Sequence, residues 1–181
     1  MQMTIHILTP FARDKNLGKA YNDAIVLIPD SDWICLMDYD AMFLMPEQIN
    51  RMYEYVEKFP NASMFVCYGS RVHDLSPQSF KDKKYESATG IAGHIVLAQQ
   101  QFEKGVVASR VVRPVAGFLM LFSKATWFSF KFIEGIGCLK VDTTFSKQIL
   151  YSGGQILLME SIYIWHTYRL ATHKKDITHL I

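Results

Sequence analysis

The chain has 181 residues, of which 50% are hydrophobic and 13% aromatic, and its formal net charge is +2. This composition supports a buried core and argues against intrinsic disorder. The 19 basic and 17 acidic residues nearly balance, and no long basic run is present, which argues against a nucleic-acid-binding surface. We therefore expect one globular domain over residues 1–181 without a nucleic-acid partner.

The three cysteines, Cys35, Cys67 and Cys138, are widely spaced in apolar surroundings. An odd number of cysteines without a Cys-x-x-Cys pair argues against a disulfide framework or a structural zinc site. We expect reduced, buried thiols in a cytoplasmic protein, since neither a signal peptide nor a transmembrane run is recognisable. The segment Trp127–Phe132 could contact a membrane surface peripherally, although burial in the domain is the commoner explanation of such a run.

Predicted strands and helices alternate up to Tyr68. The apolar pattern predicts strands at residues 4–8, 33–37 and 64–68, and helices at 17–28 and 46–59. The residues 33–37 form a continuous apolar run, as expected for a strand that is covered on both faces. The order strand, helix, strand, helix, strand predicts an α/β domain with a largely parallel sheet.

The second half of the chain begins with a polar segment, Gly69–Gly90, which we interpret as a long surface loop of the kind that often covers a site. The remaining predicted elements are a helix at 91–102, a strand at 116–122 with Gly117 inside it, a short helix from Ser123 to Trp127, a helix at 141–151, a strand at 155–159 and an alternating segment at 162–166.

The segment Asp38-Tyr39-Asp40 is the strongest indication of chemistry, because it places two carboxylates directly after a buried strand. Residues i and i+2 of a strand share a face and lie about 6.6 Å apart, so the two anions would repel each other. A divalent cation would remove this repulsion, and carboxylate oxygens suit Mg²⁺ or Mn²⁺. The alternative is that both aspartates only cap the following turn.

Several motifs in order resemble those of the nucleotide-sugar glycosyltransferases of the GT-A fold, particularly family 2. Asn16-Leu17-Gly18-Lys19-Ala20-Tyr21-Asn22 is similar to the helix that precedes the family's Asp-x-Asp motif, here Asp38-Tyr39-Asp40. Val115-Ala116-Gly117-Phe118 resembles the glycine-bearing strand beside the donor sugar and the acceptor. Val141-Asp142, Gly153-Gly154 and Trp165-His166-Thr167-Tyr168-Arg169 resemble the late part of the domain, which carries a further metal-binding histidine in some of these enzymes.

The resemblance implies a GT-A, Rossmann-like fold with a mixed, mostly parallel sheet flanked by helices. It implies transfer of a sugar from a UDP- or GDP-sugar to a hydroxyl of a carbohydrate, glycolipid or glycoprotein acceptor. Mn²⁺ or Mg²⁺ would be bound by Asp38, Asp40 and His166, where mixed oxygen and nitrogen ligands suit Mn²⁺ better. The implied donor-binding residues are Pro10, Phe11, Asn16, Lys19, Asn22, Asp38, Gly117, Tyr168 and Arg169.

The catalytic candidates each have an alternative explanation. Asp142 could take the proton from the acceptor hydroxyl as a general base, or it could cap the helix that begins near Thr143. Glu134 is the reserve candidate for the base. His166 could be an ordinary partly buried histidine, and Arg169, whose planar fork matches phosphate oxygens, could form a surface ion pair instead.

The chain departs from the family in its first part, because Pro10–Lys15 leads directly into Asn16 without the usual second strand. A base pocket would then be built from Thr9, Pro10, Phe11 and the helix. Two other functions remain open. One is a non-catalytic nucleotide- or sugar-binding protein of the same fold. The other is a haloacid-dehalogenase-like phosphatase with Asp38 as the nucleophile, although Met42 and the late position of the motif depart from that family.

Overall fold

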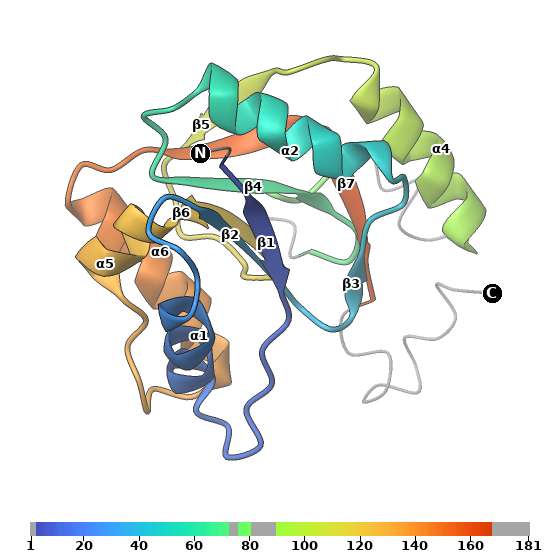
Figure 1. The fold of residues 1–181 in the computed structure, drawn as a ribbon. Coiled ribbons are helices and arrows are strands. Elements are labelled where there is room, and N and C mark those ends of the chain that lie inside the picture. Colours follow the sequence, from blue (N-terminus) through green and yellow to red (C-terminus); the bar gives the residue numbers. More distant parts are fainter. Residues whose placement is uncertain (1–2, 73–75, 81–89, 168–181) are drawn as a thin grey trace. The chain divides into compact units, whose positions relative to one another are not determined.

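The structure is a computed structural model that describes residues 3–72, 76–80 and 90–167 (Figure 1). Within these residues the chain forms two compact units. The first contains residues 3–38, 61–66 and 110–157, and the second contains 39–60, 67–109 and 158–167. Each unit is assembled from three chain segments, and the single domain expected from the sequence stays a prediction.

The first unit is built on four neighbouring strands. β1 (Ile5–Leu8) is parallel to β2 (Trp33–Met37), with Ile5 opposite Trp33. β6 (Leu119–Ser123) is antiparallel to β2, and the start of β4 (Met64–Gly69) pairs with β6 in the same sense. The residues 33–36 and 119–122 are all buried, so β2 and β6 form the centre of this core. The continuous apolar run at 33–37 correctly predicted a strand covered on both faces.

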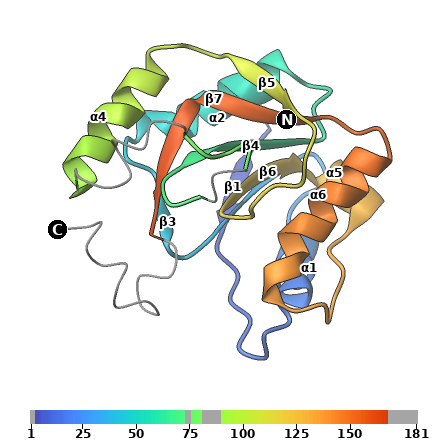
Figure 2. The ribbon, with the colours of Figure 1, turned by 180° about the vertical axis from the view of Figure 1, so that it is seen from behind.

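Three helices of the first unit lie together beside these strands in both views of the molecule (Figures 1 and 2). They are α1 (Leu17–Val26), α5 (Lys124–Phe130) and α6 (Val141–Tyr151). Aromatic rings fill the space between helices and sheet. Phe145 of α6 stacks on Phe132 with 4.1 Å between ring centroids, Phe122 of β6 lies 5.1 Å from Phe145, and Tyr21 of α1 meets Phe132 edge-on at 5.0 Å. These contacts bury large apolar area and fix the helices against the sheet.

The second unit is organised around β7 (Ile156–His166), which enters this unit at Leu158. β3 (Ala41–Met42) is antiparallel to its end, and β5 (Ala108–Val111) also pairs with it. α2 (Glu47–Lys58) is fixed to β7 by two buried side chains: the Tyr55 hydroxyl lies 2.8 Å from Ser161 Oγ, and Gln48 Nε2 donates to the Tyr163 carbonyl at 2.7 Å. α4 (Gly90–Phe102) contributes His94, whose Nδ1 lies 2.7 Å from the Tyr163 hydroxyl.

The predicted fold class is confirmed as α/β with a mixed sheet and helices, but the expectation of a mostly parallel sheet is wrong. The strand order is β1-β2-β6-β4-β7-β3, with β5 on β7. The β1–β2 pair is parallel, whereas β2–β6, β4–β6 and β3–β7 are antiparallel. The alternation of strands and helices predicted a largely parallel sheet. The sheet instead places β6, from much later in the chain, between β2 and β4 and antiparallel to both.

Several predicted boundaries differ from the observed ones. α1 ends at Val26, and the predicted strand at 116–122 begins only at Leu119, so Gly117 lies in the preceding turn. The two late apolar segments form the single strand β7. The sequence did not predict β3, β5 or the 3₁₀ turn η1 (Cys138–Lys140), because these elements are too short to show a hydrophobic period.

The predicted surface loop Gly69–Gly90 and the cysteines also need correction. Within the described part of that loop, Gln78 and Ser79 are buried, and Ser79 forms a β-bridge with Gly69. Residues 73–75 and 81–89 lie outside the described residues.

Cys35 and Cys67 are free and buried as expected, and burial raises the pKa of the Cys35 thiol to about 12. Cys138 is exposed instead, because it lies in η1 at the surface.

Among the described residues, no helix has both the length and the apolarity required to cross a bilayer. The segment Trp127–Phe132 contributes Trp127 and Phe132 to the core, while Phe128 is half-exposed. Its apolar pattern is therefore explained mainly by burial.

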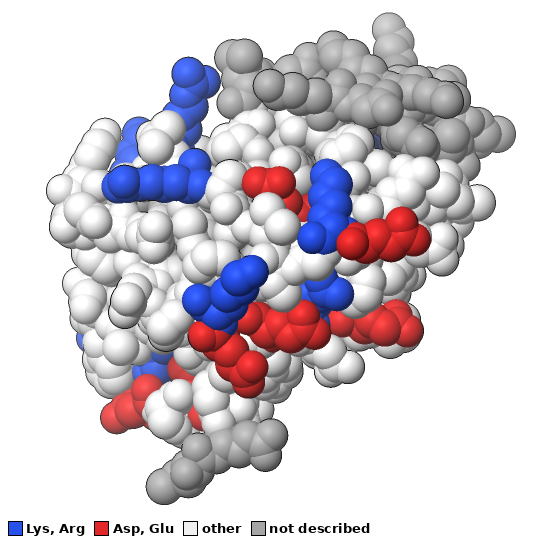
Figure 3. Space-filling view, turned by 90° about the horizontal axis from the view of Figure 1, so that it is seen from above, with Lys and Arg blue, Asp and Glu red and all other residues white. Residues whose placement is uncertain are grey.

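Charged groups of both signs are interspersed on the face shown in Figure 3, and on α2 Arg51 Nε lies 3.0 Å from Glu54 Oε2.

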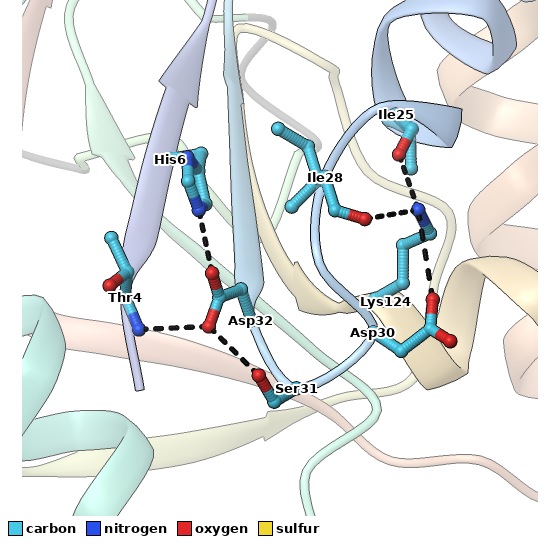
Figure 4. Close-up of polar contacts among 8 residues, drawn as sticks. All are labelled: Thr4, His6, Ile25, Ile28, Asp30, Ser31, Asp32 and Lys124. Atoms are coloured by element: carbon cyan, nitrogen blue, oxygen red, sulfur yellow. Dashed lines mark hydrogen bonds and ion pairs between the residues drawn. The ribbon is translucent and has the colours of Figure 1, made fainter. Parts of the chain in front are cut away.

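Two buried charges fix the loop between α1 and β2 (Figure 4). Asp32 Oδ2 lies 2.8 Å from His6 Nε2 on β1, and Asp32 Oδ1 accepts from Thr4 N and Ser31 Oγ, both at 3.2 Å. Lys124 is only 2% exposed, and its Nζ donates to the carbonyls of Ile25, Val26 and Ile28. A cation at this place adds a donor to the carbonyl groups at and just beyond the C-terminal end of α1, and it complements the dipole of that helix.

We expect Asp32→Asn to destabilise the fold at neutral pH and to do so less in acid. The hydrogen bond from His6, followed by those from Thr4 and Ser31, lowers the pKa of Asp32 from 3.8 against an opposing effect of burial. A lowered carboxyl pKa contributes stability above 3.8 that is lost as pH falls through the folded-state value. Urea denaturation of both proteins between pH 7 and pH 3 measures this. Glu57→Gln, which removes an exposed carboxylate, is the control, and a pH-independent difference would contradict the assignment.

Candidate functional site

The two aspartates of the Asp38-Tyr39-Asp40 motif lie beyond the end of a strand, and Asp40 is in a turn. β2 ends at Met37, residues 39 and 40 form the turn, and β3 begins at Ala41. The backbone of Asp38 is fixed to the neighbouring segment, because its N–H donates to the Phe118 carbonyl at 3.1 Å. Strand alternation was therefore the wrong reason for expecting both carboxylates on one side. The turn brings them together.

His166 is placed beside Asp40 by the pairing of β3 with the end of β7 (Figure 1). Ala41 lies opposite His166 in this antiparallel pair. The Asp40 carbonyl accepts from Thr167 N at 2.8 Å and from Thr167 Oγ1 at 3.0 Å. Ser70 Oγ accepts from His166 N at 2.8 Å and donates to the His166 carbonyl at 3.0 Å. The backbone on both sides of the imidazole is thus fixed by hydrogen bonds.

Asp38, Asp40 and His166 together could hold a metal ion. His166 Nε2 lies 3.5 Å from Asp40 Oδ1, and one ligand atom from each of the three residues lies within 4.8 Å of the others. Asp38 is joined to Asp40 through Tyr39 alone, so this part of the cluster is local to the turn. Two ligands that bind one ion at about 2.2 Å can be at most about 4.4 Å apart. The donor set therefore fits a divalent ion after a shift of a few tenths of an ångström.

Asp142 forms a second carboxylate site in the first unit. It lies in the first turn of α6, where its Oδ1 accepts from Thr143 N and its Oδ2 accepts from Gly117 N, both at 2.7 Å. A Cβ atom at position 117 would lie 2.7 Å from the Asp142 Cβ. Gly117 is therefore required for this close approach, and the group that approaches its backbone is the Asp142 side chain.

The interpretation of Asp142 as an N-cap is wrong, because Lys140 occupies the N-cap position. The Asp142 carboxylate is half-buried, and burial raises its pKa above 3.8, although the hydrogen bonds from Thr143 and Gly117 act in the opposite direction. Asp142 and Asp38 both raise the pKa of the buried Tyr21 hydroxyl, where burial is the larger cause. The two carboxylates thus lie close enough to act on one side chain of α1.

The motif Asn16-x-Gly18-x-x-x-Asn22 of α1 binds the chain's own segment around Phe132–Gly135. Asn22 Oδ1 accepts from Trp127 Nε1 and Phe132 N, and Asn22 Nδ2 donates to the Phe132 carbonyl at 2.9 Å. Asn16 Oδ1 caps α1 at Lys19 N and accepts from Gly135 N at 2.9 Å. A Cβ atom on Gly18 would lie 2.3 Å from the Ile133 carbonyl oxygen. The motif is therefore an internal clamp, and its donor-binding role stays a prediction.

The remaining predicted site residues are more dispersed. Glu134, the reserve base, is exposed and accepts from Asn22 Nδ2 at 3.1 Å. Lys19 is exposed and pairs with Asp23 one turn along α1. Phe11 is exposed and Pro10 is partly buried. Tyr168 and Arg169 lie outside the described residues.

Sequence reasoning missed Tyr21, Ser70 and Thr167. Tyr21 belongs to the apolar stripe of α1, so its pattern indicated only a core residue. Ser70 lies at the start of the segment that was expected to be a loop, and its contact with His166 joins residues 96 positions apart. Thr167 was part of the late motif, but its hydrogen bonds to Asp40 depend on the pairing of β3 with β7.

Comparison with known proteins finds no family model that matches the chain and no similar curated protein. The function must therefore be argued from the geometry and chemistry of these residues, together with the resemblance of the motifs.

We expect Asp142→Asn to change how stability depends on pH. Because the folded-state pKa is raised, the folded protein binds more protons than the unfolded chain between pH 3.8 and that value. The contribution of Asp142 to stability therefore decreases as pH rises through this window. Relative to the variant, the wild-type protein should lose unfolding free energy between pH 3 and pH 7. Denaturant titrations measure this, with Glu103→Gln as the control. A constant difference would show that burial does not raise the pKa.

Proposed function

We propose that the protein is a metal-dependent glycosyltransferase that moves a sugar from a UDP- or GDP-sugar to a hydroxyl acceptor, in the synthesis of a polysaccharide or glycoconjugate. The observation that carries the proposal is the convergence of His166 with Asp38 and Asp40, which lie more than a hundred positions earlier in the chain. The motif resemblance had proposed this same set of three ligands.

The donor set favours Mn²⁺, with Mg²⁺ as the second choice. One imidazole nitrogen and two carboxylate oxygens suit an ion of intermediate softness, whereas Mg²⁺ prefers oxygen ligands throughout. When bound, the metal would supply Lewis-acid stabilisation of the negative charge that develops on the departing diphosphate. The chain's contribution is the fixed position of its ligands, since Ser70 and Thr167 hold the backbone around His166 and Asp40.

Asp142 is the residue we assign as general base. Its oxygens accept backbone hydrogen bonds from Gly117 and Thr143, and the carboxylate has further lone pairs that could accept the proton of an acceptor hydroxyl. Its raised pKa makes it a stronger base than an ordinary aspartate. The carboxylate would take the hydroxyl proton as the oxygen attacks the sugar carbon and the bond to the diphosphate breaks.

A non-catalytic nucleotide-binding protein is the second candidate, and one observation favours it. The side chains of Asn16 and Asn22, on which part of the resemblance rests, are used in internal hydrogen bonds. The two asparagines therefore have a structural function that does not require the protein to be a catalyst. The two candidates share metal and nucleotide binding and differ in turnover.

We expect Asp40→Asn to abolish metal-dependent binding of nucleotide. In the wild-type protein, UDP or GDP with Mn²⁺ should raise the melting temperature, since a ligand at 100 times its Kd stabilises the native state by about 2.7 kcal/mol. Either nucleotide without metal should have little effect. Differential scanning fluorimetry measures these shifts, with Asp30→Asn, at a carboxylate whose side chain is 82% exposed, as the matched control. A full shift in the Asp40 variant would remove Asp40 from the site.

We expect Asp142→Asn to retain nucleotide binding and to lose about 10²–10⁴-fold in turnover. In the wild-type protein, activity should decrease as pH falls through the raised pKa of Asp142, because only the ionised carboxylate can accept a proton. A screen of sugar nucleotides with mass detection of the released diphosphate measures turnover. Nucleotide binding without turnover of any donor would favour the binding protein. Release of phosphate from an aryl phosphate would indicate the phosphatase with Asp38 as nucleophile.

A further inference from the structure

A groove of about 320 Å³ lies in the first unit, between the chain that leaves β5 and the last turns of α6. It is lined by two cationic side chains, Arg110 and Lys147, and otherwise mainly by apolar groups. The groove is separate from the cluster around Asp38 and is not part of the proposed transfer step. Its volume is at the small end of the range for ligand pockets, which suits a ligand of one or two rings.

The charge of the groove favours an anionic ligand. No carboxylate lines it, and within the described residues neither Arg110 nor Lys147 forms an ion pair. The surrounding sequence has the same bias, because no Asp or Glu occurs between Gly105 and Ile133, whereas four basic residues do. Both cations are exposed and available to a ligand from solution.

The apolar wall of the groove favours a ring. Tyr151 is 84% exposed and Val112 is 74% exposed, and both line the groove together with Pro114 and Leu150. An exposed tyrosine offers a flat apolar face and a polar hydroxyl, which suits a ring with one apolar face and several hydroxyl groups. A cationic pair beside such a face fits a sugar ring that carries a carboxylate or a phosphate.

Two chain segments connect residues that line the groove to the surroundings of Asp142, and their lengths limit the distance between the two places. Pro114 precedes Gly117 by three residues, which span at most about 11 Å, and Gly117 N contacts Asp142 Oδ2 at 2.7 Å. Along α6, Tyr151 lies nine residues beyond Asp142, or about 13.5 Å. A ligand longer than one ring could therefore occupy the groove while another part of it lies near Asp142.

We propose that this groove binds an anionic sugar unit of the acceptor, as a subsite beside the proposed transfer site. The assignment of this sugar to the acceptor rests on the proposed function. The binding of an anionic sugar to the groove can be tested without metal or donor. The two sources of the charge are a uronic acid and a sugar phosphate. Arg110 and Lys147 would contact the anionic group, and Tyr151 would contact the ring.

The test is calorimetric titration of the full chain with D-glucuronate, glucose 6-phosphate and glucose, at low and high salt. At least one anionic sugar should bind saturably, more tightly than glucose and less tightly at high salt. The preferred anion identifies the source of the charge. The double variant Arg110→Gln/Lys147→Gln should weaken binding about tenfold, because each exposed ion pair contributes less than about 1 kcal/mol. Tyr151→Ser should weaken all three sugars alike.

Arg113→Gln is the matched control, because it removes one positive charge from the same chain segment at a residue that does not line the groove. It should change affinity less than twofold, and the melting temperature of every variant should stay unchanged because the side chains are exposed. Failure of both anionic sugars to bind at millimolar concentration, or equal binding by the double variant, would overturn the subsite.

The melting-temperature shifts caused by Mn²⁺ with UDP or GDP should be measured on the same samples. They distinguish a failure of the sugar subsite from a failure of the proposed function. Intact nucleotide binding without sugar binding would overturn the subsite alone. Sugar binding without any metal-dependent nucleotide binding would overturn the proposed function and the acceptor role together.

Discussion

The antiparallel pairing of β3 with the end of β7 is the constraint on which the candidate metal site depends. It consists of only two residue pairs, Ala41 with His166 and Met42 with Trp165. A two-residue strand has little stability by itself. The hydrogen bonds of Thr167 to the Asp40 carbonyl and of Ser70 to the His166 backbone extend this pairing beyond the ladder. The position of the imidazole is thus determined by backbone contacts on both of its sides.

The positions of the Asp40 and Asp142 carboxylates are produced by different physical means. Asp40 is directed toward His166 by a turn and a short ladder, whereas Asp142 is held by a glycine that leaves room for it and by two N–H donors. The first arrangement leaves charge available for a cation. The second combines donors that favour the ionised carboxylate with burial that disfavours it. The surroundings of the two aspartates therefore differ in how they act on the ionised carboxylate.

The sequence predicted those features that depend on local pattern. The run at 33–37 and the stripe at 141–151 gave β2 and α6 with correct bounds, because burial on both faces and helical periodicity are local properties. The direction of β6, the pairing of β3 and the function of Asn22 as a clamp depend on residues more than eighty positions apart. For the site, the sequence indicated Asp38, Asp40 and His166 through motif resemblance. It could not indicate Ser70, whose role exists only in the folded chain.

The burial of Lys124 has a further consequence for the chemical reactivity of the protein. Its ammonium group is enclosed by three carbonyl oxygens at the end of α1 and has almost no contact with solvent. Reagents that modify amines need access to an unprotonated nitrogen, so Lys124 should react last among the lysines that the structure describes. Its rate of labelling would then report how often the end of α1 separates from α5. One lysine thus provides a built-in probe of local opening in the helical layer that supports the Asn16–Asn22 clamp.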